Sequence, residues 1–314
     1  MARQPVQMVI TPVDGSENAI RSLNYLNLYF SALPDMKVVL LYILPTLPPM
    51  LVDECKKDRV AAQKLKAVEQ KNAQMAEKIL AEAKDKLLGN GFRADQVETV
   101  YRPKEKDTAR DICRWAENKR ADAMLVNTRG RSRLEAFFMG ETARKVLEFA
   151  RVCPVWLIKG TVRSKRVLIA IDSSENALRA ADHAGFMLAG TDCQITLFHS
   201  IRNLIRFVPK ELLEDAAELE ELWEHAAGQD IAPNMKKAKE ALLKAGLDEV
   251  QITTKVVNGS RSAAVDILDE ARQGEYGTVV MGRRGRSAIK DYMLGSISRK
   301  VLDDFENMAV WIVK

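Results

Sequence analysis

The stretch Thr278–Ser296 reads TVVMGRRGRSAIKDYMLGS and places Gly282, Gly285 and Gly295 in a G-x2-G-x9-G-S pattern. A short apolar run bounded by glycine is typical of a buried strand. Glycines directly after a strand let the backbone approach an anion closely, because no Cβ stands in the way. A helix predicted at Ile297–Phe305 would offer free N–H groups and the positive end of its dipole to the same anion. The stretch therefore predicts a strand, an anion-binding turn and a helix.

A degraded copy of this pattern lies in the first half of the chain. Gly130 precedes Gly285 by 155 positions, and VWLIK at Val155–Lys159 precedes VWIVK at Val310–Lys314 by the same number. An offset that holds over the chain distinguishes a duplication from a chance match of two glycine-rich turns. The sequence therefore predicts a tandem repeat.

Apolar runs alternate with helical patterns in both halves, which predicts a parallel α/β sheet in each. In the first half, strands are expected at Gln7–Val13, Lys37–Tyr42, Gln96–Tyr101, Ala123–Val126 and Pro154–Ile158. In the second half, they are expected at Arg166–Ile171, Gln194–Phe198, Gln251–Val257, Thr278–Met281 and Ala309–Val313. The length suits two domains, each able to bury its own core, and we place them at residues 1–160 and 161–314.

The two halves differ most in the region after the second strand. From about Asp53 to Leu88, the first half predicts one long, charged helix; a helix packed across the sheet is favoured over a partner-binding coiled coil. Its expected interior positions are Leu65, Val68, Asn72, Met75 and Ile79. The second half carries an acidic run at Glu211–Glu224, which favours a solvated amphipathic helix over a surface lid or a dimer contact. A further helix is expected at Met235–Ala245.

Composition excludes several classes of protein. The chain has 48 lysines and arginines against 43 aspartates and glutamates, a net charge of +5 that is too small and dispersed to predict nucleic-acid binding. The N-terminus lacks the pattern of a signal peptide, and no apolar stretch approaches the roughly 20 residues of a membrane helix. We expect a cytoplasmic protein with no membrane attachment.

Four cysteines and three histidines show no C-x-x-C pair and no metal-ligand spacing. Reduced and mostly buried thiols are therefore expected, with no metal site. The cysteines are Cys55, Cys113, Cys153 and Cys193.

The glycine pattern matches neither the Walker loop nor the G-x-G-x-x-G dinucleotide fingerprint. It resembles the G-x2-G-x9-G-[ST] signature of the ATP-binding branch of the universal stress protein family, and the whole chain resembles a tandem member of that family. The resemblance implies two open five-stranded domains of the Rossmann-like, adenine nucleotide alpha hydrolase-like kind. It also implies that the terminal strands Val155–Ile158 and Val310–Val313 pair antiparallel, joining the domains as an internal pseudo-dimer. A homodimer of two chains is left open.

The same resemblance implies the residues that hold the nucleotide, which would be ATP, with or without Mg²⁺. Asp172 would contact the ribose or the adenine, and the backbone around Ala170 and Ser200 would line the adenine pocket. Ser200 departs from the family, which commonly has valine after the histidine at this place. The ribose and phosphates would be held by Met281, Gly282, Arg284, Gly285, Gly295, Ser296, Ile297 and Ser298.

The first half departs further from the family pattern. Asn127 replaces the first glycine, Glu141 replaces the serine, and Arg102 is aligned with Gly259 of the second half. A carboxylate at a helix start satisfies the dipole, worth roughly 0.3–1 kcal/mol, and repels an incoming triphosphate. We predict that the first half keeps the fold and loses most of its nucleotide affinity.

The first half nevertheless retains part of the pattern, which leaves weak nucleotide binding as an alternative. We favour the interpretation that these residues are kept for the geometry of the turn. They are Asp14, Gly130 and Gly140.

Three functions fit the sequence. The first is a nucleotide-binding stress or signalling module with an unidentified protein partner. The second is a slow Mg²⁺-dependent ATPase, although no general base or activated nucleophile stands beside the motif, and we assign no catalytic residue. The third is a ligand-free interaction module with an anion patch at Arg283, Arg284 and Arg286; the patch lacks the interleaved aromatics of a nucleic-acid surface.

Overall fold

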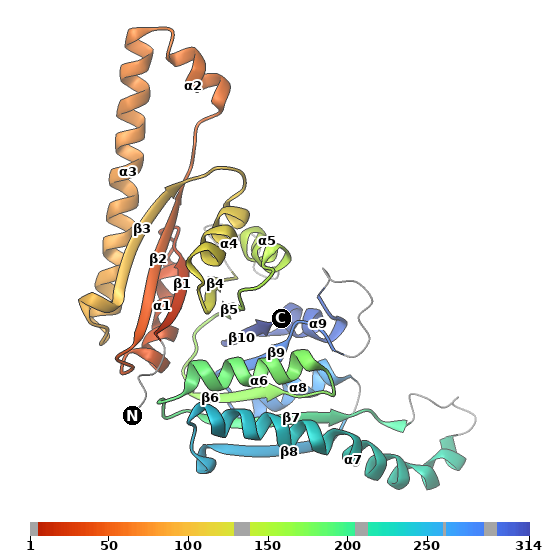
Figure 1. Ribbon diagram of the computed structural model, residues 1–314. Helices are drawn as coiled ribbons and strands as arrows, with labels where there is room; N and C mark the ends of the chain where they lie inside the picture. Colours follow the sequence, from red (N-terminus) through yellow and green to blue (C-terminus); the bar gives the residue numbers. More distant parts are fainter. Residues whose placement is uncertain (1–5, 129–138, 205–212, 260–261, 286–293) are drawn as a thin grey trace. The chain divides into compact units, whose positions relative to one another are not determined.

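The computed structural model describes residues 6–128, 139–204, 213–259, 262–285 and 294–314. The chain divides into two compact units, Met1–Cys153 and Pro154–Lys314. Each unit is built on a mainly parallel sheet against which its connecting helices pack, as Figure 1 shows. The predicted α/β class with two tandem repeats is therefore confirmed.

The first unit contains four parallel strands in the order β3-β2-β1-β4. Its strands are β1 (Gln7–Pro12), β2 (Met36–Leu44), β3 (Val97–Pro103) and β4 (Ala123–Asn127). Its helices are α1 (Glu17–Phe30), α2 (Pro49–Cys55), α3 (Arg59–Leu88), α4 (Thr108–Lys119) and α5 (Glu141–Phe149), with a short 3-10 turn at Ala94–Gln96.

The second unit has the strand order β5-β10-β9-β6-β7-β8. Its strands are β5 (Val155–Lys159), β6 (Arg166–Ala170), β7 (Gln194–Ile201), β8 (Ile252–Asn258), β9 (Thr278–Gly282) and β10 (Met308–Val313). Its helices are α6 (Glu175–Leu188), α7 (Leu213–Ala245), α8 (Ala263–Gln273) and α9 (Ser296–Asp304), with a short 3-10 turn at Glu249–Gln251.

The strand β5 comes from the first repeat but belongs to the second compact unit. It pairs antiparallel with β10, so the expected antiparallel pairing of the terminal strands is confirmed. Because of this pairing, the compact units divide before Pro154 rather than after Gly160, where the repeats divide in sequence. At the centre of the pair, Trp156 lies opposite Trp311 and the two indoles stack 3.9 Å apart.

His183 of α6 lies against this tryptophan pair. Its Nε2 accepts a hydrogen bond from Nε1 of Trp156 at 3.1 Å, which requires a neutral ring with the proton on Nδ1. Burial of the ring lowers the pKa of His183 from its ordinary value of 6.5 to about 3.

This lowered pKa makes the stability of the fold depend on pH. Below about pH 6.5 the unfolded chain binds a proton that the folded chain does not, so the free energy of unfolding falls as pH falls toward 3. At pH 5 the contribution of His183 amounts to a loss of about 2 kcal/mol relative to pH 7.5. Urea unfolding at both pH values should show a loss that is about 2 kcal/mol larger in the parent than in His183→Gln, whose side chain cannot be protonated. An equal loss in both proteins would contradict the assignment.

The predicted long helix of the first unit is two helices. α2 ends at Cys55, and α3 begins at Arg59 after Asp58, whose Oδ1 accepts the backbone N–H of Ala61 at 2.7 Å. An aspartate in this position is a helix cap. The prediction of one helix from Asp53 was therefore wrong, since it overlooked this start signal.

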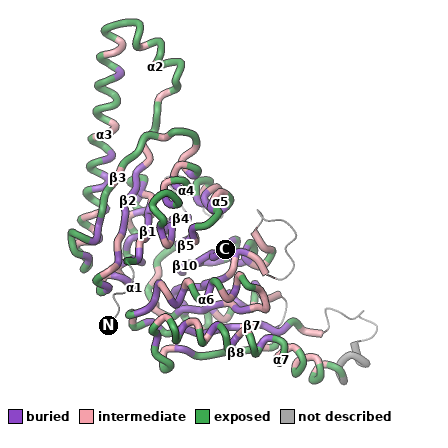
Figure 2. Tube along the Cα trace, in the orientation of Figure 1, coloured by how far each residue is buried: buried purple, intermediate pink, exposed green. Residues whose placement is uncertain are grey.

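The expected interior face of α3 is confirmed only in part. Leu65 and Ile79 are buried, but Val68 and Met75 expose 43% and 41% of their surfaces. The C-terminal half of the helix packs on β2 and β3, whereas α2 and the N-terminal half of α3 extend past the sheet (Figures 1 and 2). A helix packed across the sheet therefore describes only the second half of α3.

In the second unit, the predicted helix at Met235–Ala245 is the end of the longer helix α7, which contains Pro233. Ile231, Met235, Ala238 and Leu242 are buried at spacings of four, three and four, and this face packs on α6. Residues 211–212 of the predicted acidic run lie outside the described residues, and the rest of the run is helical.

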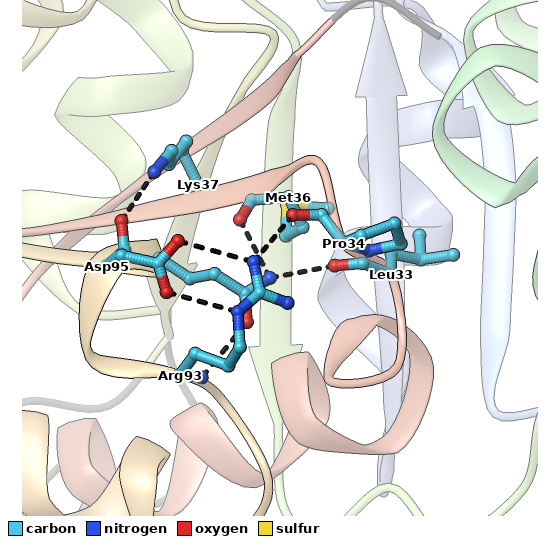
Figure 3. A network of polar contacts seen from close by, with 7 residues as sticks. Leu33, Pro34, Met36, Lys37, Arg93 and Asp95 are labelled. Atoms are coloured by element: carbon cyan, nitrogen blue, oxygen red, sulfur yellow. Dashed lines mark hydrogen bonds and ion pairs between the residues drawn. The ribbon is translucent and has the colours of Figure 1, made fainter. Parts of the chain in front are cut away.

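A hydrogen-bonded glutamine repeats in both units, buried at Gln96 and half-buried at Gln251. The amide of Gln96 donates to the carbonyls of Leu33 and Met36, and that of Gln251 donates to the carbonyls of Thr191 and Cys193. Each glutamine thus ties the start of one strand to the loop before its neighbour. In the first unit, Figure 3 shows the contacts of Arg93, Lys37 and Asp95 around this point.

All four cysteines lie in the described residues, and none forms a disulfide. Cys113, Cys153 and Cys193 are buried and Cys55 is half-buried, and burial raises the pKa of Cys153 and Cys193. Within the described ranges, no helix combines the length and apolar character needed to cross a membrane.

Candidate functional site

The candidate site lies where the strand order of the second unit reverses. The chain proceeds from β6 to β7 and β8 on one side and places β9 and β10 on the other, so β6 and β9 are neighbours across the reversal. In open α/β sheets, ligands bind outside the carboxyl ends of the strands at such a point. Asp172 follows β6 and Gly285 follows β9, so both lie at this edge.

Asp172 and the glycine turn touch each other. A Cβ placed on Gly285 would lie 2.5 Å from Oδ2 of Asp172. The other carboxylate oxygen, Oδ1, accepts the backbone N–H of Ser174 at 3.0 Å and also its hydroxyl. Ser174 in turn caps α6 by accepting the N–H of Ala177. The cap of α6 therefore fixes the carboxylate against the turn.

The glycines are required by close packing. A Cβ on Gly282 would lie 2.8 Å from the backbone carbon of Asn176, and one on Gly295 would lie 3.2 Å from Cα of Arg284. None of Gly282, Gly285 and Gly295 has a positive φ, so a left-handed backbone is not the reason for glycine here. At Gly282 the end of β9 instead lies too close to the backbone of α6 for a side chain, and at Gly295 the start of α9 lies close to the turn.

Among the described residues, the N-cap position of α9 provides no side-chain cap. Gly295 is the N-cap residue, and its own N–H donates to the carbonyl of Arg283 at 2.9 Å. Ser296 is exposed at the first helical position and Ile297 is half-buried. The first turn of a helix carries N–H groups with no partner inside the helix, together with the positive end of the dipole. This end of α9 is therefore suited to an anion.

Ser298 is placed differently from what the sequence suggests. It is buried, and its hydroxyl donates to the carbonyl of Gly282 at 3.0 Å. Ser298 thus joins α9 to the end of β9 and positions the turn. Of the other predicted residues on this side, Met281 is buried within β9, and Arg284 is half-buried beside the turn.

The adenine side of the predicted site lies at the ends of β6 and β7. Ala170 is half-buried and Ser200 is buried; the Ser200 hydroxyl donates to Oδ2 of Asp266 at 2.5 Å. A Cβ on Gly259 would lie 2.3 Å from Oγ of Ser200 and 2.6 Å from Oδ2 of Asp266. Gly259 therefore leaves the space that this serine and aspartate occupy.

His199 and Asn234 support the same loop. Nδ1 of His199 donates to the carbonyl of Ile171 at 2.7 Å, and burial lowers the pKa of its ring. The Asn234 amide, from α7, donates to the carbonyl of Asp172 at 3.1 Å. The structure thus brings the predicted residues of the second half to one edge of the sheet and adds Asp266 and Asn234 to them.

Asp266 and Asn234 had no signal in the sequence that pointed to this place. Asp266 stands four residues after Ser262, the cap of α8, and Asn234 follows the proline inside α7. Both positions are typical of ordinary surface polar residues, so only the fold reveals them.

In the first unit, a carboxylate pair stands where the second unit has serines. Glu141 begins α5 and pairs with Lys145 at 2.8 Å, and Lys145 also pairs with Asp107 at 3.1 Å. The hydrogen bond from Lys145 holds the pKa of Glu141 below its ordinary value. The places of Glu141 and Asp107 are taken in the second unit by Ser296 and Ser262. The described part of the first unit therefore adds two carboxylates near the start of α5.

Two contacts around the degraded turn are nevertheless kept. Asp14 accepts the N–H of Ser16 at 2.9 Å, as Asp172 accepts that of Ser174. The Gly140 N–H donates to the carbonyl of Thr128 at 2.6 Å, which matches the contact from Gly295 to Arg283. Gly130 lies outside the described residues.

The register of β3 corrects one alignment. The N–H of Lys104 donates to the carbonyl of Leu44, as the N–H of Gly259 donates to that of Ile201. Arg102 lies opposite Ile43, one residue before Leu44, so it lies inside the strand pair rather than after it. The residue in the place of Gly259 is therefore Lys104, and the alignment with Arg102 was wrong by two positions. Glycine is still missing from this place in the first half.

Among the described residues, no group of three or more histidine, cysteine, aspartate or glutamate side chains is placed to hold a metal ion.

Comparison with known proteins gives a consistent result. The model of the universal stress protein family matches residues 6–159 and again residues 163–314. The universal stress protein YxiE of Bacillus subtilis (strain 168) is 28% identical over 145 residues, which cover 43% of this chain and 90% of that protein. A universal stress protein from Archaeoglobus fulgidus DSM 4304 has the same fold, with a TM-score of 0.67, 20% identity and coverage of 98% of both chains. A second Archaeoglobus fulgidus universal stress protein, solved in complex with dAMP, is 21% identical, with a TM-score of 0.35, and covers 51% of this chain and all of that one.

Proposed function

Because the chain belongs to the universal stress protein family, whose model matches both of its halves, we propose that it is a tandem nucleotide-binding module for stress response or signalling. The nucleotide is ATP, and the second half holds it. The first half keeps the fold as a partner domain with little nucleotide affinity.

One observation carries the proposal: the Asp172 carboxylate lies against Gly285 at the sheet edge where α9 also begins, with a glycine at its N-cap. A carboxylate beside bare backbone suits a ribose hydroxyl, which donates to it. A turn without Cβ atoms and a helix N-terminus together suit a chain of phosphates rather than a neutral group. The two kinds of group are adjacent here, as they are in a nucleotide.

The residues of the second half would divide the ligand between them. Asp172 would accept hydrogen bonds from the sugar, and the N–H groups of Ser296 and Ile297 would face the phosphates. The backbone around Ala170 and Ser200 would line the base. Mg²⁺, bound with the phosphates, would spread their negative charge; Asp172 offers the carboxylate oxygen that such an ion prefers.

The first half differs in charge at the matching positions. Glu141 and Asp107 place two carboxylates near the start of α5, where the second half has two serines, and Lys145 neutralises only part of that charge. Asn127 and Lys104 also put side chains where the second half has glycines. We therefore propose one nucleotide per chain.

Native mass spectrometry of the freshly purified chain, followed by acid release of the ligand, tests both the ligand and its number. We expect one ATP per chain when ATP and magnesium are supplied. Two nucleotides per chain would contradict the proposed asymmetry. No nucleotide under any condition would contradict nucleotide binding itself and favour the ligand-free interaction module.

A further inference from the structure

Two hydrogen bonds fix the backbone on both sides of Asp172. The carbonyl of Ile171, the residue before it, accepts a hydrogen bond from Nδ1 of His199 at 2.7 Å. The carbonyl of Asp172 itself accepts one from the side-chain amide of Asn234 at 3.1 Å. A peptide unit is planar, so holding the two units that adjoin a residue fixes both of its backbone dihedrals. His199 and Asn234 therefore set the direction in which the side chain of Asp172 leaves the backbone.

The start of α6 then orients the carboxylate of Asp172. Oδ1 accepts hydrogen bonds from the backbone N–H and the hydroxyl of Ser174. Oδ2 is the oxygen that lies against Gly285. The backbone contacts and the contact with Ser174 together direct Oδ2 toward the glycine turn.

Both donors to this backbone stand on regular secondary structure. His199 is in β7, which pairs with β6 and with β8. Asn234 is in α7, between the buried residues Ile231 and Met235 of the face that packs on α6. Figure 1 shows α7 lying along α6. Donors on a packed helix and a paired strand hold a site more precisely than donors on loops.

The first unit has a different residue in the place of Asn234. Leu87 and Leu242 occupy equivalent positions, because the carbonyl of each accepts the N–H of the residue five places later. Eight positions before them stand Ile79 and Asn234. Ile79 is buried and has no side-chain N–H to donate. The first half therefore keeps Asp14 without a donor from the corresponding position of its long helix.

We propose that Asn234 is a positioning residue for recognition of the sugar, which holds Asp172 so that its carboxylate accepts the hydroxyls of a ribose. The inference rests on the function proposed above, and it assigns part of the selection of the ligand to a helix outside the glycine turn. Asn234 acts through Asp172 and not by touching the nucleotide. Its contribution to affinity therefore exists only for a ligand that has sugar hydroxyls to donate.

Isothermal titration calorimetry of the full-length chain with ATP and with 2′,3′-dideoxy-ATP, each with magnesium, tests the proposal. We expect the parent to bind ATP at least about tenfold more tightly than the dideoxy nucleotide. Asn234→Leu keeps the approximate size of the side chain, and Asn234→Ala reduces it. Each variant should bind ATP at least about fivefold more weakly and dideoxy-ATP within about twofold of the parent. Retained affinity for dideoxy-ATP also shows that the variant is folded.

Asp172→Ala completes a double-mutant cycle. This variant should bind the two nucleotides alike, and adding Asn234→Leu to it should change neither affinity further, because the residue through which Asn234 acts is gone. The matched control is Gln229→Leu on the same helix. Gln229 is exposed and its amide contacts His225 rather than the loop after β6, so this variant should keep the parent's preference for ATP.

The outcomes separate this inference from the proposed function. Equal losses for the two nucleotides in the Asn234 variants would show a merely structural role and overturn the inference. A parent that binds ATP and dideoxy-ATP equally overturns it too, and so does an Asn234 variant that keeps the full preference for ATP. In those three cases nucleotide binding itself stands. A parent that binds neither nucleotide overturns the proposed function and this inference with it.

Discussion

Replacing Ser296 with glutamate is expected to lower the affinity of the chain for ATP about 100-fold, or about 2.7 kcal/mol. Ser296 is the exposed first residue of α9, directly after the glycine that closes the turn. A carboxylate there would face the same N–H groups as the phosphates and repel their charge. The same carboxylate interacts favourably with the helix dipole, worth about 0.3–1 kcal/mol, so the free energy of unfolding should rise slightly. Isothermal titration calorimetry and urea unfolding measure the two opposite effects.

The control for this change is Ser296→Gln, which has the size of glutamate without its charge. We expect its affinity to stay within a few fold of the parent, because the side chain at this position points to solvent-accessible space. Equal losses in the two variants would show that bulk, not charge, prevents binding.

The first half offers the reciprocal change, Glu141→Ser with Asn127→Gly. If that variant binds no more nucleotide than its parent, charge repulsion is not what separates the two halves.

Most elements of the candidate site could be predicted from the sequence because they lie in one short stretch. Gly282, Gly285 and Gly295 follow a buried strand at fixed spacing, and Asp172 ends another strand, so parallel pairing alone brings them to one edge of the sheet. The reason for the glycines was predicted less well. They allow close packing against Asn176, Asp172 and Arg284. The sequence carries no pattern from which these close approaches could be predicted.

The errors have physical causes that can be named. β3 exposes most of its residues, so it lacks the alternation of buried and exposed positions that fixes a strand register, and Arg102 was assigned in place of Lys104. Asp58 was a readable helix cap, but the charged residues around it continued the helical pattern of the whole region. The positioning contacts of Asn234 and Asp266 join residues more than 60 positions apart, and no periodicity encodes them.

Adding a methyl group at Gly285 is expected to reduce nucleotide affinity at least about tenfold, or about 1.4 kcal/mol, while changing stability little. The new Cβ would lie 2.5 Å from Oδ2 of Asp172. Among the described residues other than its chain neighbours, the only further atom within 4 Å is Cγ of the same carboxylate. A carboxylate can rotate away at small cost, but it then loses its place beside the turn. Since Gly285 does not have a positive φ, alanine adds no backbone strain.

Gly282→Ala is the matched comparison, because the same methyl group meets backbone there. Its Cβ would lie 2.8 Å from the carbonyl carbon of Asn176 and 2.9 Å from the oxygen, so α6 itself must move. Overpacking of this kind costs about 1–3 kcal/mol of stability. Urea unfolding and calorimetric titration of both variants should therefore separate the two roles, with Gly285→Ala lowering chiefly affinity and Gly282→Ala lowering stability. If Gly285→Ala binds ATP as tightly as the parent, the carboxylate of Asp172 does not take part in the site, since that substitution displaces little else.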